Sequence, residues 1–485
     1  MVYPNRVLIT LLFLVLSQRV ACQVVLTLQE ANVIGSQNYD ATFTTGQLAI
    51  PLTGILSTAW QTIPVQIRNS GNASLANGTS NFSAGNISFE LANIGGITPG
   101  ATGFVGTSAG AVNISSSFQT IFSPTAANSD APTGAIAGRY RIARTILANT
   151  ALIAGNYTGG NLIYNQPTSS IIQLLVGYRY ITPSPVTLSL GIPYLNKWVT
   201  FATSFTKNYN NVSSFTTVAD LDFNLTNFTV GHTEPSFIDI KAQGPITFTP
   251  NGGGATTTVP VNIVQAQGSG LVTTALSTTY AALNTTGLVV PTGNITTIPL
   301  TLKISAANVV QHFFKPGTYT FSIDLRTRNS GNTIADVKTL SFTVTTDVLS
   351  SIAVQGTPDV NFSYGSLADY QTTKSINMPN HLLITNNRNY EVYVKSSTAN
   401  FTRNSIATTI PASIVQIENG TGESTVTGRT LSTTSQSIIT NAGSTIGRQL
   451  SLKYTIPASQ TLQFLGKQTG ATPYILNVIY SFTSL

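Results

Sequence analysis

Charged side chains are scarce in this chain: they make up 8% of its 485 residues, with 23 Lys and Arg against 16 Asp and Glu. The basic residues are scattered singly along the chain, so no basic cluster is present to follow a phosphate backbone. This pattern argues against a nucleic-acid partner. The surface is expected to consist mainly of Ser, Thr, Asn and Gln side chains, whose hydrogen bonds depend little on salt.

Cysteine is also nearly absent, because Cys22 is the only one in the sequence. Small secreted scaffolds of animal type depend on disulfides, whereas a chain of this length can bury hydrophobic cores without them. A protein exported from a bacterial cell fits this composition best.

The N-terminus carries the pattern of a secretory signal peptide. Arg6 precedes an apolar run over residues 7–16, interrupted only by Thr10, which predicts a cleaved leader over residues 1–22 and export of the rest. In the alternative, Cys22 is lipidated and anchors the chain, but Arg19 stands where an aliphatic residue is expected. No other apolar stretch approaches the roughly 18–20 residues of a membrane-spanning helix, so no transmembrane span is predicted.

The residue types that perform catalysis or bind metals are few and dispersed. His232, His312 and His381 lie in different regions, without other ligands at the spacing of a zinc site. Residues 106–110 match the spacing of a hydrolase nucleophile elbow but lack its strand and helix. The oxygen-bearing side chains over 220–224 are not followed by the glycine and glutamate of an EF-hand. No catalytic residue, cofactor or metal is therefore predicted.

Apolar and polar residues alternate in runs separated by Gly, Pro, Asn, Ser and Thr. Such runs occur over residues 24–28, 63–67, 223–230, 390–394 and 474–482, the third and last with one irregularity each. Alternation with a period of two is typical of strands with one face in a core and the other in water. The residues between the runs favour turns. The fold class is therefore predicted to be all-β, with sheets packed as sandwiches.

An internal repeat suggests how these strands are organised. Tyr157 follows the strand at 140–142 at the same spacing as Tyr319 follows the strand at 302–304, and Gly stands two residues before each Tyr. A third, looser copy ends at Tyr474. Each Tyr ring is expected to cover the end of a core while its hydroxyl bonds to the backbone, which is a structural role.

The repeat and the length together predict three domains. At about 100–200 residues per domain, a chain of 485 residues contains roughly three. After the leader over 1–22, we predict β-sandwich domains over residues 23–182, 183–346 and 347–485.

Two tryptophans are candidates for a ligand site. Trp60 and Trp198 each stand three residues before an alternating strand, so they occupy equivalent places in two repeats. Large aromatic side chains are buried on average, which favours packing in a core or at a domain edge. The alternative is a platform on which a sugar ring stacks.

The leader, the low charge, the Thr-rich strands and the Gly-Thr-Tyr ending over residues 317–323 together resemble bacterial fimbrial subunits and spore coat protein U-like secreted proteins. The resemblance implies tandem Ig-like β-sandwich domains, and assembly in which a strand is donated to a neighbour's open edge. The chain lacks the disulfide cysteines of those families, so chaperone-usher assembly is not implied and no residue role is carried over.

These observations predict an exported, non-enzymatic structural or adhesive protein of the bacterial cell surface, fimbria-like or coat-like, either secreted or held at the surface. Its expected partners are other envelope proteins, or copies of itself, bound by strand pairing, with surface glycans as further candidates. The alternative function is that of an extracellular carbohydrate-binding accessory protein.

Overall fold

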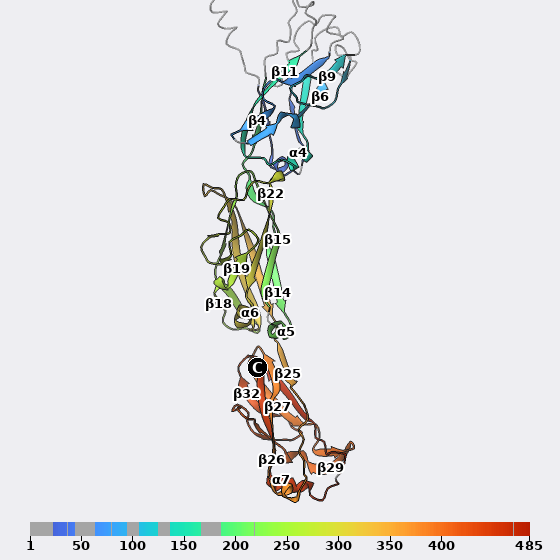
Figure 1. Cartoon of the computed structure of the whole chain (residues 1–485). Coiled ribbons are helices and arrows are strands. Elements are labelled where there is room, and N and C mark those ends of the chain that lie inside the picture. The colour runs from blue at the N-terminus through green and yellow to red at the C-terminus, as the bar shows by residue number, and fades with distance from the viewer. Residues whose placement is uncertain are drawn as a thin grey trace, which may run out of the picture.

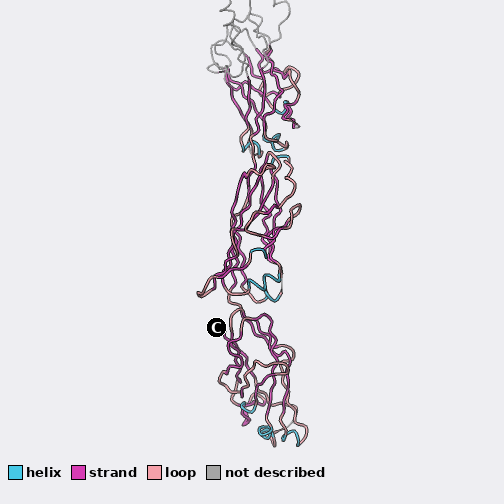
Figure 2. The backbone as a smooth tube through the Cα atoms, turned by 90° about the vertical axis from the view of Figure 1, so that its left-hand side faces the viewer, coloured by secondary structure: helices cyan, strands magenta, loops and turns pink. Residues whose placement is uncertain are grey.

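The computed structural model describes residues 23–35, 37–43, 64–78, 80–94, 106–124, 136–165, 186–217, 219–468 and 470–485. The predicted leader over 1–22 and Trp60 lie outside these residues. The chain forms three β-sandwiches stacked end to end, the N-terminal one at the top of Figure 1 and the C-terminal one at the bottom. Strands make up most of the backbone, and the short helices lie in the connections (Figure 2). The predicted all-β fold with several sandwiches is confirmed.

The second sandwich has the most complete set of strands. One sheet has the order β13 (Asn196–Thr200), β15 (Leu221–His232), β22 (Ile295–Ile304), β19 (Val264–Gln267) and β20 (Thr274–Ala275). The other has the order β14 (Ser204–Tyr209), β24 (Ile334–Thr346), β23 (Gly317–Arg328), β16 (Phe237–Ala242) and β21 (Ala281–Ala282); β17 (Ile246–Pro250) also pairs with β23, and β18 (Thr257–Val259) pairs with β17.

The first sandwich repeats this strand order. One sheet runs β2 (Tyr39–Phe43), β10 (Ile136–Ile142), β6 (Ser88–Ile94) and β8 (Val112–Asn113). The other runs β1 (Gln23–Thr27), β12 (Val186–Ile192), β11 (Gly155–Asn165), β3 (Val65–Asn69), β9 (Gln119–Pro124) and β7 (Gly106–Ser108), with β4 (Ser74–Asn77) and β5 (Ser80–Ser83) beside β11. In both sandwiches an early strand pairs in parallel with the last one, β1 with β12 and β14 with β24.

The third sandwich has one sheet with the same order and one shorter sheet. The first runs β25 (Ser350–Val354), β26 (Lys374–Asn386), β33 (Thr445–Ile456), β30 (Gln416–Asn419) and β31 (Arg429–Thr430). The second contains β32 (Gln436–Ala442), β27 (Tyr390–Ser396) and β34 (Val478–Ser484), and a hairpin of β28 (Asn400–Arg403) and β29 (Ile406–Pro411) stands apart.

Each sandwich encloses its own cluster of buried apolar side chains, supplied by the inward positions of the alternating strands. The clusters extend from Val24 to Leu195, from Trp198 to Leu349 and from Leu382 to Ile456. The first core continues beyond the predicted boundary at residue 182, because β12 pairs with both β1 and β11. The domain boundaries at 23–182, 183–346 and 347–485 stay predictions.

The longest described helix, α6 (Ala306–Phe313), was missed in the sequence. It joins β22 to β23, and shorter segments stand at the same point of the other sandwiches: α4 (Arg144–Ala148), and α7 (Ala458–Thr461) with η8 (Leu462–Phe464). Its signals were the cap residue Ser305 and the buried pair Val309 and Phe313, four positions apart. None of the helices in the described ranges is long and apolar enough to cross a membrane.

A buried asparagine ties the first sandwich to the second. The Asn294 amide donates to the carbonyl of Leu152 at 2.7 Å and to that of His232 at 2.9 Å. Its side-chain oxygen accepts from the Leu152 N–H at 3.1 Å. A backbone bond of 2.9 Å from Ala154 to Thr233 lies beside it. Because these groups are removed from water and satisfied across the junction, the two sandwiches are held together by directional bonds.

Candidate strand-acceptor site

Two of the predicted tyrosines occupy matching positions. Tyr157 in β11 and Tyr319 in β23 are each 1% exposed. The hydroxyl of Tyr157 donates to the carbonyl of Ile153 at 3.1 Å, and that of Tyr319 to the carbonyl of Lys315 at 2.9 Å. In both cases the acceptor lies four residues earlier, which is the tyrosine corner of Ig-like sandwiches. Burial raises the pKa of the Tyr319 phenol, so the hydroxyl keeps its proton.

The third predicted tyrosine lies differently. Tyr474 is half-buried in the connection before β34, and its hydroxyl donates to the carbonyl of Gln468 at 3.2 Å. This acceptor lies six residues earlier and the bond is exposed. The third repeat therefore keeps the tyrosine without the tight corner.

Trp198 lies in the core of the second sandwich. It is 3% exposed, and its ring meets Phe228 edge-on at a centroid distance of 6.0 Å. Its backbone N–H donates to the carboxylate of Asp336 at 3.0 Å. These contacts favour the packing interpretation over a sugar platform, because neither ring face is open to solvent.

The candidate catalytic residues do not converge. His232 lies in β15, His312 in α6 and His381 in β26, so the third is in a different sandwich from the other two. Ser108 ends the short strand β7 and is followed by an exposed turn rather than a helix. Within the part of the chain that the structure describes, no three His, Cys, Asp or Glu side chains group as metal ligands would.

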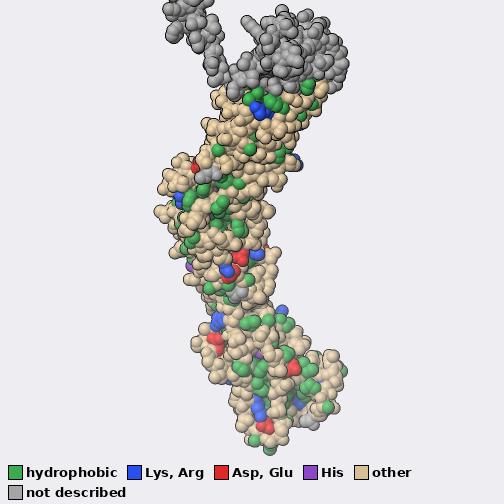
Figure 3. Space-filling model, turned by 45° about the horizontal axis from the view of Figure 1, so that its top comes forward, with side chains coloured by type: hydrophobic (Ala, Val, Ile, Leu, Met, Phe, Trp, Pro, Cys, Tyr) green, Lys and Arg blue, Asp and Glu red, His purple; other side chains and the backbone are tan. Residues whose placement is uncertain are grey.

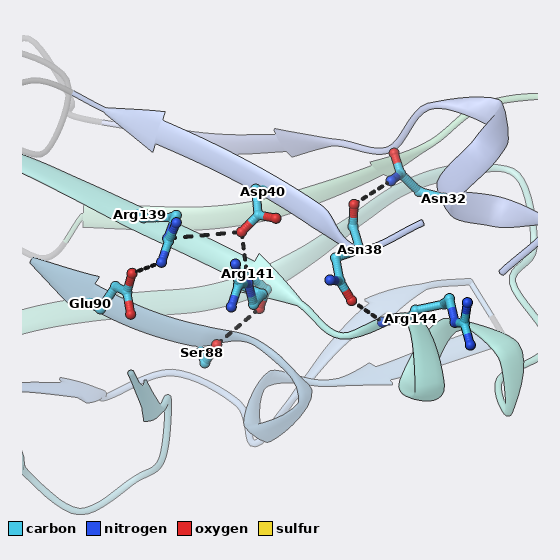
Figure 4. Close-up of polar contacts among 8 residues, drawn as sticks. All are labelled: Asn32, Asn38, Asp40, Ser88, Glu90, Arg139, Arg141 and Arg144. Carbon is cyan, nitrogen blue, oxygen red and sulfur yellow. Dashed lines mark hydrogen bonds and ion pairs between the residues drawn. The ribbon is translucent and has the colours of Figure 1, made fainter. Parts of the chain in front are cut away.

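A polar cluster lies on the first sandwich, on strands β2, β6 and β10 (Figure 4). Asp40 pairs with Arg141 at 2.8 Å and with Arg139 at 3.9 Å, and Arg139 also pairs with Glu90. A shallow depression beside Asp40 is lined in part by Arg144. The side chains of Asp40, Arg139 and Arg141 are each more than a third exposed. Ion pairs that are this exposed contribute little to stability. This cluster has the character of a solvated sheet face.

The third sandwich differs from the other two at the edge of its shorter sheet. The order β32, β27, β34 reproduces β21, β16, β23 of the second sandwich, and β34 follows β33 as β23 follows β22. No described strand takes the positions of β24 and β14. Strand β34 consequently forms the edge of its sheet, and it pairs only with β27 within the described residues.

The backbone of β34 presents polar groups at this edge that no described residue pairs with. The Leu485 N–H donates to Asn389 at 2.8 Å and the Ser397 N–H donates to Asn477 at 2.9 Å, and the register between these two bonds has no bulge. Bonding to the neighbour alternates along an antiparallel strand, so residues 477, 479, 481, 483 and 485 face β27. The N–H and C=O groups of residues 478, 480, 482 and 484 therefore point to the open side.

The inward side chains of β34 are incompletely covered. Those of β23, such as Phe321 at 4% exposure, are buried, and the Phe342 ring of β24 stacks on Phe321 at 4.8 Å. The corresponding side chains of β34, Val478, Tyr480 and Phe482, are only half-buried. The missing neighbour thus leaves an apolar row as well as unpaired backbone.

A second segment, without regular secondary structure, takes the place of β14 in the order of elements along the chain. In the second sandwich β13 is followed by β14, by α5 (Ser213–Thr216) and by β15; in the third, β25 is followed by residues 359–364, by η6 (Leu367–Gln371) and by β26. Within this segment Val360, Phe362 and Tyr364 are half-buried and alternate with exposed residues. Val360 and Phe362 pack against the same core as Val478 and Tyr480. We call the open edge of β34 together with residues 359–364 the acceptor slot.

No known family model matches the chain, and no curated protein matches it. The CooA pilin subunit from enterotoxigenic Escherichia coli is similar to it at 14% identity over 32% of this chain and 99% of that chain, with a TM-score of 0.22. A chaperone-tip adhesion subunit complex from the archaic chaperone-usher Csu pili of Acinetobacter baumannii is similar at 14% identity over 58% and 99%, with a TM-score of 0.30.

A family 123 glycoside hydrolase from Clostridium perfringens is similar at 11% identity over 30% of this chain and 22% of that chain, with a TM-score of 0.18. The first two of these neighbours are pilus proteins. At such TM-scores these likenesses carry no argument about function, and the sandwich fold rests on the strand orders given above.

Proposed function

We propose that this chain is an exported, non-enzymatic structural or adhesive protein of the bacterial cell surface that binds its neighbour through the acceptor slot. One observation carries the proposal: β34 has an unpaired edge over a half-buried apolar row, whereas the equivalent strand β23 is covered by β24. Export and the leader peptide belong to the proposal and rest on the sequence pattern.

The edge of β34 favours another strand as its partner. Unpaired backbone groups at a sheet edge form a template for strand addition, and proteins usually protect such edges with Lys, Pro or a bulge. Residues 478–484 contain no charged residue and no proline, and their pairing with β27 has no bulge. The edge strand β14 of the second sandwich, in contrast, carries Lys207. Strand addition would satisfy the unpaired groups.

The second sandwich indicates what the partner strand looks like. Strand β24 runs antiparallel to β23 and turns Leu340, Phe342, Val344 and Thr346 inward, while the residues between them face outward. The partner of the third sandwich is therefore an extended segment of another polypeptide with apolar residues at every second position. It would run antiparallel to β34, with residues 359–364 beside it as β14 lies beside β24.

The surface suits an extracellular, non-enzymatic role. On the face drawn in Figure 3, charged side chains are few and widely spaced among uncharged polar ones. A surface of hydroxyl and amide groups is little affected by changes in ionic strength. The three sandwiches stacked end to end in Figure 1 would also hold the first and the third well apart, as a surface or fimbrial component requires.

The proposal can be tested with a strand taken from the chain itself. A capped synthetic peptide of residues 339–346, the core-facing half of β24, is added to the full chain, and binding is measured by fluorescence anisotropy and hydrogen exchange. We expect saturable binding with amide protection in β34, and no binding of a control peptide with Ser at the positions of Leu340, Phe342 and Val344. Equal behaviour of the two peptides, or no protection of β34, would contradict the proposal.

A further inference from the structure

Three polar side chains form a hydrogen-bonded relay inside the third sandwich, next to the acceptor slot. The Nε2 atom of His381 lies 2.9 Å from the Tyr454 hydroxyl, which lies 2.7 Å from the Tyr480 hydroxyl. These residues belong to β26, β33 and β34, so the relay joins the two sheets of the sandwich. Its last member, Tyr480, belongs to the apolar row of the slot.

No such relay is present among the described residues of the second sandwich. Its equivalent strands β15, β22 and β23 place Phe223, Leu302 and Phe321 in an apolar core. The Phe223 and Phe321 rings meet edge-on at a centroid distance of 6.4 Å. The polar relay therefore belongs to the sandwich with the open edge, and the strand order that the two sandwiches share does not require it.

The relay as it stands suits a neutral His381. The side chain is 2% exposed, and its Nδ1 atom has no hydrogen-bond partner in the part of the chain that the structure describes. Burial lowers the pKa of His381 and raises the pKa of Tyr454 to about 12, while the pKa of Tyr480 is raised well above its ordinary value. All three groups are thus uncharged near neutral pH.

The neighbouring strands offer no charge to stabilise an imidazolium. Strand β25 has no titratable residue, and Tyr480 is the only one in β34. The charged residues of the other strands point away from the ring or are paired elsewhere: Glu391 and Lys395 alternate with the core-facing residues of β27, Lys453 pairs with Glu418, and Arg448 pairs with Glu423. A protonated His381 would lack an acceptor for its Nδ1–H and a counter-charge.

We propose that His381 makes the acceptor slot sensitive to acid, so that proton uptake by this side chain opposes the binding of a strand on β34. The inference rests on the proposed function. Binding of a strand buries Tyr480 and the relay further and so favours neutral His381; by thermodynamic reciprocity, protonation weakens strand binding. The pKa of a buried neutral histidine is lower in the folded protein than in the unfolded chain. The stability of the strand-bound slot is therefore fully present above about pH 6.5 and decreases as the pH drops below this value.

Binding of the residue 339–346 peptide to the full chain at about pH 7.5 and about pH 5 tests this inference. The peptide has no titratable side chain, so a change in affinity belongs to the protein. We expect the dissociation constant to rise about tenfold in acid, the equivalent of one pKa unit. His381→Gln, which can still bond Tyr454 but cannot titrate, should bind at neutral pH and lose most of this dependence.

His232→Gln is the matched control. His232 is also buried, but both of its ring nitrogens are bonded at 2.8 Å, to the Glu234 carbonyl and the Thr296 hydroxyl, and it lies in the second sandwich. Its replacement should leave the pH dependence of peptide binding unchanged. An acid dependence that persists in His381→Gln, or is absent from the unsubstituted chain, would overturn the inference.

Two further readouts keep the outcomes separate. If neither the unsubstituted chain nor the His381→Gln variant binds the peptide at neutral pH, the proposed function fails, whatever the role of His381. If His381→Gln does not fold, the His381 titration is followed by NMR in the unsubstituted chain, with and without peptide. The peptide should lower the pKa of His381, and an unchanged titration would contradict the inference.

Discussion

The second and third sandwiches share a strand order and differ by two strands. In the second, β24 and β14 close the sheet beside β23; in the third, the equivalent strand β34 is left at the edge. The side chains of Phe321 and Phe482 illustrate the consequence, since the first is buried under a stacked ring and the second is half-buried. The burial of an apolar side chain thus depends on the neighbouring strand as much as on its own position in the alternation.

The largest difference between the two sandwiches should appear on deleting these two rings. Phe321→Ala should destabilise the second sandwich by about 3–5 kcal/mol, the usual range for a buried phenylalanine. Phe482→Ala should destabilise the third by only about 1–2 kcal/mol, because part of its surface is already in water. Local unfolding free energies from hydrogen exchange in β23 and β34 provide the measurement.

The outward neighbours of these rings serve as controls. Ser322→Ala and Ser481→Ala alter side chains of the same two strands that do not enter the core, so each should change stability by less than about 0.5 kcal/mol. If Phe482→Ala proved as destabilising as Phe321→Ala, β34 would be as well covered as β23 and the comparison would be wrong.

A smaller effect is expected from closing the open edge within one chain. A copy of residues 329–346, which are the turn and β24 of the second sandwich, is joined after Leu485. The copied Leu340, Phe342 and Val344 would cover the apolar row and stabilise the third sandwich by about 3 kcal/mol after the entropy of ordering the strand. Thermal unfolding and hydrogen exchange of β34 measure this gain.

The same extension with Ser in place of the three copied apolar residues is its control, and it should leave the stability of the third sandwich unchanged. A gain of equal size from both extensions would mean that the added chain acts without filling the slot.

The smallest effect concerns the tyrosines. Tyr319→Phe removes a buried hydroxyl and leaves the Lys315 carbonyl without its donor, which should destabilise the second sandwich by about 1 kcal/mol. Tyr474→Phe removes only an exposed bond to Gln468 and should have almost no effect. Urea unfolding of the two variants tests the difference, and equal losses would show that the third sandwich has a corner after all.

Much of the fold could be predicted because it depends on short-range patterns. Alternation identified strands such as β15 and β27, and the Gly-x-Tyr pattern located Tyr157 and Tyr319 because each hydroxyl bonds only four residues back. The helix α6 was missed because it is short and only two of its buried apolar residues mark its inner face.

The candidate site could not be predicted because an open edge leaves no mark on the strand that forms it. Residues 474–482 alternate as well as any other run, and alternation says which face of a strand is buried without saying whether both edges are paired. The relay of His381, Tyr454 and Tyr480 was equally hidden, because its members come from three strands far apart in the sequence.

The amino-acid pattern alone specifies a protein made of strands with a polar, weakly charged exterior, because side-chain direction along a strand has a period of two whatever its neighbours are. Which strand stands at the edge of the third sandwich depends instead on long-range strand pairing. The pairing of β34 with β27 joins residues distant in the sequence. The open position beside β34 is recognised only by comparison with the other two sandwiches, where β24 and β12 occupy it.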